Sequence, residues 1–235
     1  MPNNYFSFKL FTIRQDKASF KVGTDGVLLG ATANTEGAGR VLDVGSGTGL
    51  IAIMLAQRCN ALITAIEPDR ESYMQCMENV MHCPWKDRIT VENTSIQEFR
   101  SSGTFDLIVS NPPYFSNSLK NPDPRKSASR HSDSLSDDDL LEYCSALLSV
   151  NGRLQVIMPY NEGKLLVTRA EKYNLFCNEL ISIKPLPSGE TIRQIITLSH
   201  ASTEITESSL TIGTGIRHHY TEEYISLTRD FYLKF

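Results

Sequence analysis

The chain has 235 residues, of which 40% are hydrophobic and 21% charged, and its formal net charge is −4. This composition is that of a globular protein, and the length suffices for one large domain with a full core. The acidic balance excludes a protein that coats a polyanion through its overall charge, although it leaves a local basic patch open.

Two apolar stretches near the amino terminus, Phe6–Ile13 and Ala18–Val22, flank the polar segment Arg14–Lys17. This pattern predicts a β-hairpin that turns at Arg14–Lys17 and precedes the main sheet. We therefore expect a single domain in two parts, which are an N-terminal hairpin and helix extension at 1–35 and a catalytic core at 36–235.

From Arg40 to about Met158, short apolar runs alternate with helical patterns. This alternation is typical of βαβ units on a parallel sheet. Asn151-Gly152 is expected to form the turn before the last strand. The expected strands are 40–44, 62–66, 89–92, 105–110 and 153–158, and the expected helices are 50–58, 70–81 and 136–148.

Three glycines, Gly45, Gly47 and Gly49, lie between the first of these strands and the first helix. Glycines at such a turn let the backbone bend tightly and approach a ligand closely. Glu67 ends the next strand, about 20 residues further on, where a carboxylate can accept hydrogen bonds from ribose hydroxyls. Together they predict a nucleoside site rather than a βα turn without a ligand.

The spacing of the glycines distinguishes between two cofactors. The dinucleotide fingerprint is G-x-G-x-x-G/A, and here the third glycine comes one position early. Asp43 also precedes Gly45 by two residues, and its carboxylate suits an ammonium better than a pyrophosphate, which prefers a bare helix N-terminus. S-adenosylmethionine has an ammonium, a sulfonium and a ribose but no phosphate. We therefore favour it over NAD.

The Asp-x-Gly-x-Gly-x-Gly pattern with a following glutamate resembles the first two motifs of the Rossmann-like methyltransferases. In many of these enzymes an acidic residue after the third strand contacts the adenine of the cofactor. The corresponding segment here reads Glu92-Asn-Thr-Ser-Ile-Gln, so we assign the adenine contact to Ser95.

The segment Asn111-Pro112-Pro113-Tyr114 directly follows the expected strand 105–110. Taken alone it is an ordinary turn. Beside a methyl donor, the Asn111 side-chain oxygen and the Pro112 carbonyl can accept both N–H groups of an amine and orient its lone pair, while the two prolines fix that geometry. The Tyr114 ring can stack on a planar substrate. The motif resembles that of amino-directed methyltransferases, which act on adenine N6, cytosine N4, guanine N2 or a glutamine amide.

The long loop at 116–134 follows this motif and is rich in Ser, Pro and Asn. A connection of this length is either functional or disordered. We expect its basic side chains to contact RNA phosphates near the site. These side chains are Lys120, Arg125, Lys126, Arg130 and His131.

Two flanking segments carry a more specific resemblance, and they begin at Lys21 (KVGTDGVLLGA) and at Tyr220 (YTEEYISLTRDFYL). With the glycine loop, Asn-Pro-Pro-Tyr and Arg130-His131 in the same order, the chain resembles the bacterial tRNA1(Val) (adenine-37-N6)-methyltransferases over nearly its whole length. In that family the first segment closes over the cofactor, which implies cofactor contacts for Thr24 and Asp25. From the residues alone, Gly23–Gly26 predicts only a turn and a helix start.

The resemblance implies an α/β fold of the class I methyltransferases, a Rossmann-like, doubly wound and mostly parallel sheet with the N-terminal hairpin and an antiparallel C-terminal hairpin. It implies a tRNA adenine N6-methyltransferase that uses S-adenosylmethionine. A protein glutamine N5-methyltransferase acting on a release factor and an rRNA guanine N2-methyltransferase remain as alternatives. A nucleoside-binding module without activity does not account for the segment at 111–114.

The remaining features concern metals and location. The five cysteines lack zinc-ligand spacing, and we expect free thiols in a reducing compartment and no metal site. No apolar run approaches the roughly 18 residues of a membrane helix, and the amino terminus lacks a signal-peptide pattern. We expect a cytoplasmic monomer.

Overall fold

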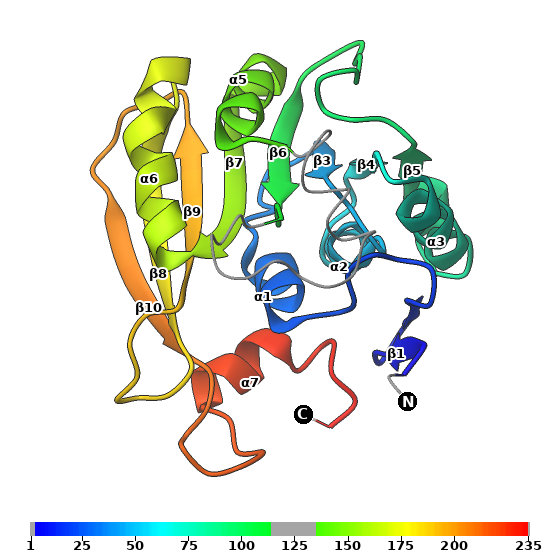
Figure 1. Cartoon of the computed structure of the whole chain (residues 1–235), viewed down its shortest axis with the longest axis vertical. Coiled ribbons are helices and arrows are strands. Elements are labelled where there is room, and N and C mark those ends of the chain that lie inside the picture. Colours follow the sequence, from blue (N-terminus) through cyan, green and yellow to red (C-terminus); the bar gives the residue numbers. More distant parts are fainter. Residues whose placement is uncertain (1–2, 114–134, 235) are drawn as a thin grey trace, which may run out of the picture.

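The central element of the protein is an eight-stranded sheet with the order β10-β8-β9-β7-β6-β3-β4-β5 (Figure 1). The computed structural model describes residues 3–113 and 135–234. β9 is antiparallel to both of its neighbours, and the other pairs are parallel. The strands are β3 (Arg40–Val44), β4 (Leu62–Ile66), β5 (Ile89–Glu92), β6 (Phe105–Ser110), β7 (Leu148–Pro159), β8 (Phe176–Lys184), β9 (Arg193–Ser199) and β10 (Thr206–Thr211).

Helices cover both faces of this sheet. One apolar layer joins α1, α2 and α3 to side chains such as Val41 and Leu107, and a second joins α5 and α6 to Leu42 and Ile108. Because neighbouring residues of one strand belong to opposite layers, the sheet is doubly wound, as predicted. The helices are α1 (Thr24–Thr32), α2 (Leu50–Arg58), α3 (Arg70–Met81), α5 (Asp137–Leu147), α6 (Tyr160–Ala170) and α7 (Glu222–Thr228), with short 3-10 turns at Lys86–Arg88 and Glu171–Tyr173.

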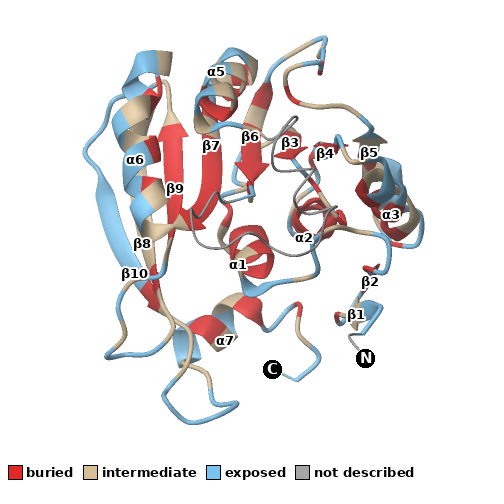
Figure 2. Cartoon of the chain, in the orientation of Figure 1, coloured by how far each residue is buried: buried red, intermediate tan, exposed pale blue. Residues whose placement is uncertain are grey.

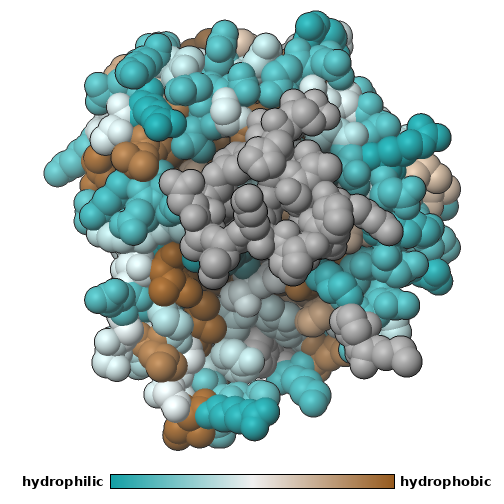
Figure 3. Space-filling view, in the orientation of Figure 1, coloured by the Kyte–Doolittle hydropathy of each residue, from teal (hydrophilic) through white to brown (hydrophobic). Residues whose placement is uncertain are grey.

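The central strands are buried, whereas the edge strand β10 is mostly exposed (Figure 2). A strand that is buried on both faces has a continuous apolar run, and this helps to explain why the sequence predicted β3, β4 and β6 correctly. The bounds of the edge strand β5 were also predicted correctly, although two of its four residues are exposed. The implied C-terminal hairpin is confirmed as the antiparallel pair of β8 and β9. The outer surface around α3 is mostly hydrophilic (Figure 3).

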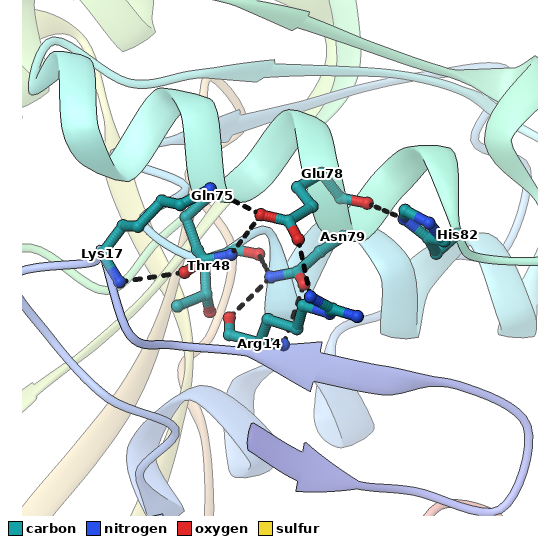
Figure 4. Close-up of polar contacts among 7 residues, drawn as sticks. All are labelled: Arg14, Lys17, Thr48, Gln75, Glu78, Asn79 and His82. Atoms are coloured by element: carbon teal, nitrogen blue, oxygen red, sulfur yellow. Dashed lines mark hydrogen bonds and ion pairs between the residues drawn. The ribbon is translucent and has the colours of Figure 1, made fainter. Parts of the chain in front are cut away.

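The N-terminal hairpin exists, but its predicted turn was wrong. β1 (Tyr5–Ser7) pairs with β2 (Thr12–Arg14), so the chain turns at Phe8–Phe11, where the Phe8 N–H donates to the Phe11 carbonyl at 2.8 Å. The two rings of that turn stack 4.6 Å apart and belong to the core. The predicted second strand at Ala18–Val22 does not form. The N–H groups of Arg14, Lys17 and Ser19 donate instead to side chains of α3, and Figure 4 shows the first two of these contacts.

The predicted turn at Asn151-Gly152 was also wrong in form, because both residues belong to β7. The pairing of β6 with β7 shifts at this point, from Phe105 opposite Leu148 to Leu107 opposite Arg153. A Cβ atom at position 152 would lie 2.7 Å from the Phe105 carbonyl oxygen. The glycine therefore permits a close approach of two strands rather than a reversal of the chain.

The two ends of the described chain lie close together (Figure 1). The Lys9 N–H donates to the Phe231 carbonyl at 2.8 Å, and the rings of Phe8 and Tyr232 stack 5.9 Å apart. These contacts tie the N-terminal hairpin to the segment after α7. None of the described helices is long and apolar enough to cross a membrane.

Candidate active site

The register of the parallel strands brings the predicted motifs to one edge of the sheet. Val44 pairs with Ile66 on one side and with Ser110 on the other. The glycine loop, Glu67 and the segment at 111–113 each begin one residue beyond these paired positions. The Ser110 hydroxyl also donates to the Val44 carbonyl at 2.9 Å, which fixes the end of β6 beside the end of β3. The site therefore lies where open α/β sheets bind ligands.

The glycine loop has the backbone geometry that only glycine adopts readily. Gly45, Gly47 and Gly49 have φ values of 71°, 54° and 79°, all in the left-handed region. A Cβ atom at position 45 or 47 would meet no described residue within 4 Å, whereas one at 49 would lie 2.7 Å from the Cys76 sulfur. The first two glycines thus border space that no described residue fills, and the third allows α3 to pack against the start of α2.

Glu67 reaches from the end of β4 to the glycine loop. Its Oε2 accepts a hydrogen bond from the Gly47 N–H at 2.8 Å, and its Oε1 accepts one from the Asp69 N–H at 2.9 Å. The residue is only 8% exposed. Burial raises the pKa of the Glu67 carboxyl to about 7, because the two backbone donors offset only part of the desolvation.

Asp43 lies beneath the glycine loop and is fully buried. Its Oδ2 accepts a hydrogen bond from the Ala52 N–H in the first turn of α2 at 3.0 Å. Its Oδ1 is buried and has no hydrogen-bond partner among the described residues. Burial raises the pKa of Asp43 to about 7, and the nearby charge of Glu67 acts in the same direction. The carboxylate therefore anchors a helix N-terminus and keeps one oxygen available for a donor.

The described part of the Asn-Pro-Pro-Tyr segment continues directly from β6. Asn111 is half-buried, Pro112 is buried and Pro113 is exposed. The helix α1 passes close by, because a Cβ atom at Gly26 would lie 3.2 Å from Leu50 Cδ2 and 4.0 Å from Asn111 Nδ2. The start of α1 thus meets both the glycine-loop helix and the segment at 111–113.

Thr24 and Asp25 form the first turn of α1. Thr24 is exposed, and the Asp25 Oδ2 accepts a 2.8 Å ion-paired hydrogen bond from Nε of Arg193, the first residue of β9. Arg193 was not predicted as part of the site. Its position follows only from the antiparallel pairing of β9 with β7, which places it opposite Pro159 at the carboxyl edge.

Ser95 follows β5, as expected, and is half-buried. Its hydroxyl accepts the Glu98 N–H at 3.3 Å, and its carbonyl accepts the Phe99 N–H at 2.9 Å. A neighbour that the sequence did not single out, Asn93, donates from Nδ2 to the Glu67 carbonyl at 2.8 Å. This amide holds the end of β4 next to the Ser95 turn.

Several predicted residues lie outside the described part of the chain. They are Tyr114, Lys120, Arg125, Lys126, Arg130 and His131. Within residues 3–113 and 135–234, no group of three or more His, Cys, Asp or Glu side chains could hold a metal ion.

Comparison with known proteins defines first the class of this chain. Residues 18–161 match the family model described as methyltransferase small domain. The fold is similar to that of a predicted O-methyltransferase from Agrobacterium tumefaciens, with a TM-score of 0.69 at 18% identity over 88% of this chain and 96% of that one. The ribosomal protein L11 methylase from Lactobacillus delbrueckii subsp. bulgaricus has a TM-score of 0.54 at 18% identity over 79% and 82%. The chain has the Rossmann-like fold of the methyltransferases.

Relatives of full length then define the particular family. The tRNA1(Val) (adenine(37)-N6)-methyltransferase of Trichodesmium erythraeum is 45% identical over 240 aligned positions, which cover all of both chains. The protein of the same name from Parabacteroides distasonis is 43% identical over 236 positions, again all of both. This chain belongs to the tRNA1(Val) (adenine(37)-N6)-methyltransferase family, as the motifs predicted.

Proposed function

We propose that the protein transfers a methyl group from S-adenosylmethionine to the exocyclic N6 amine of an adenine in tRNA. Adenine 37 of a valine tRNA, which the names of the relatives specify, is the proposed target. The observation that carries the proposal is the placement of Asn111 beside the glycine loop, with Ser110 paired to Val44. A cofactor site and an amine-orienting segment thus share one edge of the sheet.

The cofactor site fits S-adenosylmethionine on three observations. No described residue fills the space beside Gly45 and Gly47, where a bulky ligand can approach the backbone. The Glu67 carboxylate is positioned at that loop and can accept ribose hydroxyls. The buried Asp43 Oδ1 has no partner among the described residues, which suits the ammonium of the cofactor or a water that the ammonium binds. Thr24, Asp25 and Ser95 are proposed to complete the site.

The bound cofactor supplies a methyl group activated by a positively charged sulfur. In the proposed mechanism, the Asn111 side-chain oxygen and the Pro112 carbonyl accept the two N–H groups of the adenine amine and direct its lone pair. Pro112 is buried, so its carbonyl is held in place before the substrate arrives. The amine attacks as a neutral group and its proton leaves to water after transfer, so the chain needs no general base.

Residues outside the described part of the chain are proposed to hold the RNA. The Tyr114 ring would stack on the target base, and Lys120, Arg125, Lys126, Arg130 and His131 would contact phosphates on either side of it. A base in an anticodon loop is already partly unpaired, so moving it into the site costs less than the few kcal/mol needed in a duplex. On an acidic chain this grip makes tRNA binding strongly salt-dependent.

The test supplies the protein with a labelled methyl donor together with total tRNA or, separately, a release-factor protein. We expect label on tRNA, and digestion to nucleosides should recover it as N6-methyladenosine. The Asn111→Ala variant is the matched control, since it should bind the donor and transfer little label. Label on a glutamine of the release factor and none on tRNA would replace this proposal by the protein-methyltransferase alternative.

A further inference from the structure

The side chain of Asn79, on α3, connects the N-terminal segment to the glycine loop (Figure 4). Its Oδ1 accepts the Arg14 N–H at 2.8 Å, and its Nδ2 donates to the Arg14 carbonyl at 2.9 Å. The same Nδ2 also donates to the carbonyl of Thr48, inside the glycine loop, at 2.8 Å. One amide therefore bonds to two backbone segments that are 34 positions apart in the chain.

The orientation of this amide is fixed by its partners. Arg14 offers both a donor and an acceptor to the amide, in the manner of a strand pair, so a flipped amide would face N–H with N–H and oxygen with oxygen. Asn79 is only 2% exposed. A buried amide with three good hydrogen bonds is costly to break, because its partners would be left without hydrogen bonds away from water.

The N-terminal segment continues along the same face of α3. The Lys17 N–H donates to Gln75 Oε1 at 3.0 Å, and the Ser19 N–H donates to Ser72 Oγ at 3.3 Å. Residues 72, 75 and 79 are spaced as one face of a helix. Beyond Gln15, whose N–H still donates to the Asn4 carbonyl, the segment is therefore bonded to helix side chains instead of pairing with a strand.

This segment leads directly into the cofactor site. A few residues later the chain reaches Gly23, the N-cap of α1, and then Gly26, which lies against Leu50 and Asn111. The position of α1 against the site therefore depends on where the segment before it is held. Asn79 holds that segment and the glycine loop through the same side chain, although it is not part of either.

We propose that Asn79 is a positioning residue for the cofactor, which sets its affinity without contacting it. Removing the amide frees the Thr48 carbonyl and the Arg14 backbone, so residues 14–23 keep only their other bonds, and cofactor binding must then restore the order that is lost. The apparent affinity then equals the intrinsic affinity multiplied by the fraction of molecules in the competent arrangement. This inference rests on the proposed use of S-adenosylmethionine.

The test uses the full chain with Asn79→Asp, which keeps the size of the side chain but replaces Nδ2 by an oxygen that faces two carbonyls. We expect the Kd of S-adenosylhomocysteine, measured by calorimetry at pH 8, to rise at least tenfold. A tenfold rise corresponds to about 1.4 kcal/mol. In steady-state assays the KM for the methyl donor should rise, while kcat at saturating donor and the KM for tRNA stay unchanged.

The control is Glu78→Gln, which changes the neighbouring side chain of α3. Glu78 contacts the same segment through ion pairs to Arg14 at 3.0 Å and Lys17 at 2.8 Å, but these pairs are exposed and worth little. We expect its Kd to stay within twofold of the wild type. Hydrogen exchange of residues 14–23 should accelerate in Asn79→Asp and stay unchanged in Glu78→Gln.

The outcomes separate the two proposals. A wild-type protein that binds no S-adenosylhomocysteine would contradict the proposed cofactor, whereas a wild type that binds it and an Asn79→Asp variant with equal Kd would overturn the positioning role. If Asn79→Asp does not fold, Gln75→Leu removes the bonds to the Lys17 N–H and to Glu78 Oε2 but keeps the Asn79 amide, and it should raise the Kd in the same direction by a smaller factor. An unchanged Kd in that variant would then overturn the inference.

Discussion

The buried carboxylate of Asp43 allows the electrostatic argument to be tested through stability. We expect Asp43→Asn to stabilise the free protein at pH 8 and to weaken cofactor binding at the same pH. The amide oxygen can still accept the Ala52 N–H, so the contact with the first turn of α2 is kept. What the substitution removes is a charge that is fully buried.

The magnitude follows from the pKa of the group. Burial raises the pKa of Asp43 from 3.8 to about 7. Each pKa unit is worth about 1.4 kcal/mol, so ionised Asp43 lowers the free energy of unfolding by at most roughly 4 kcal/mol. The gain in the variant is smaller, because its Nδ2 takes the place of Oδ1 and has no acceptor, which costs about 1–3 kcal/mol.

The sign of the pH dependence is fixed by the same pKa. Between about pH 4 and pH 7 the folded protein holds a proton on Asp43 that the unfolded chain has lost. The stability that protonated Asp43 contributes is therefore fully present below pH 4 and is lost as the pH rises through 7. Urea unfolding of both proteins without ligand at pH 5 and pH 8 measures it. The stability of Asp43→Asn relative to wild type should rise by several kcal/mol between the two values. Equal changes in the two proteins would refute the assignment of the charge to Asp43.

Three further predictions concern the rest of the site. Glu67→Gln should weaken the binding of S-adenosylmethionine in calorimetry. It should also reduce the loss of affinity that we expect of the wild type below pH 7, with the remainder coming from Asp43, because the pKa of both carboxyls is about 7. A variant with wild-type affinity and pH dependence would argue against the ribose contact. Asn111→Ala should bind the donor normally and lose a factor of about 10²–10³ in single-turnover rate, and a near-normal rate would remove its role in orienting the amine. Asp25→Asn should change the free energy of unfolding by less than about 1 kcal/mol, because its ion pair with Arg193 is partly exposed, yet raise the donor Kd severalfold. An unchanged Kd would leave Asp25 with a structural role only.

Much of the sheet was predictable because its central strands, such as β3 and β6, are buried. β3, β4, β5 and β6 each appear in the sequence as a short apolar run, and their bounds were predicted correctly. The turn of the N-terminal hairpin was predicted at Arg14–Lys17 but lies at Phe8–Phe11. The prediction failed because the apolar residues on both sides of Arg14–Lys17, as far as Val22, have the pattern of two paired strands. In the structure, the N–H groups of Arg14, Lys17 and Ser19 donate to side chains of α3, and contacts over such separations leave no local pattern.

The sequence predicted the relative positions of those candidate site residues that come directly after a strand. The glycine loop, Glu67 and Asn111 each come directly after an apolar run, so a parallel sheet brings them together. Arg193 and Asn79 carry no such signal. Arg193 comes from an antiparallel strand that begins where the parallel strands end, and Asn79 lies in the last turn of a helix. Their roles depend on tertiary contacts alone.

The two carboxyls of the proposed cofactor site share one physical arrangement. Asp43 and Glu67 are both buried, both have a pKa near 7, and both are held by backbone N–H groups of the glycine loop or the helix after it. Keeping them ionised costs free energy in the free protein, and a ligand with an ammonium and ribose hydroxyls would offset that cost on binding. A neutral side chain at position 43 should therefore make the free protein more stable and a poorer binder of the cofactor, whereas Gln at position 67 gains less stability because it can accept only one of the two backbone N–H groups that Glu67 accepts. Stability and affinity are in opposition at these two residues because the same desolvated charge lowers one and provides the other.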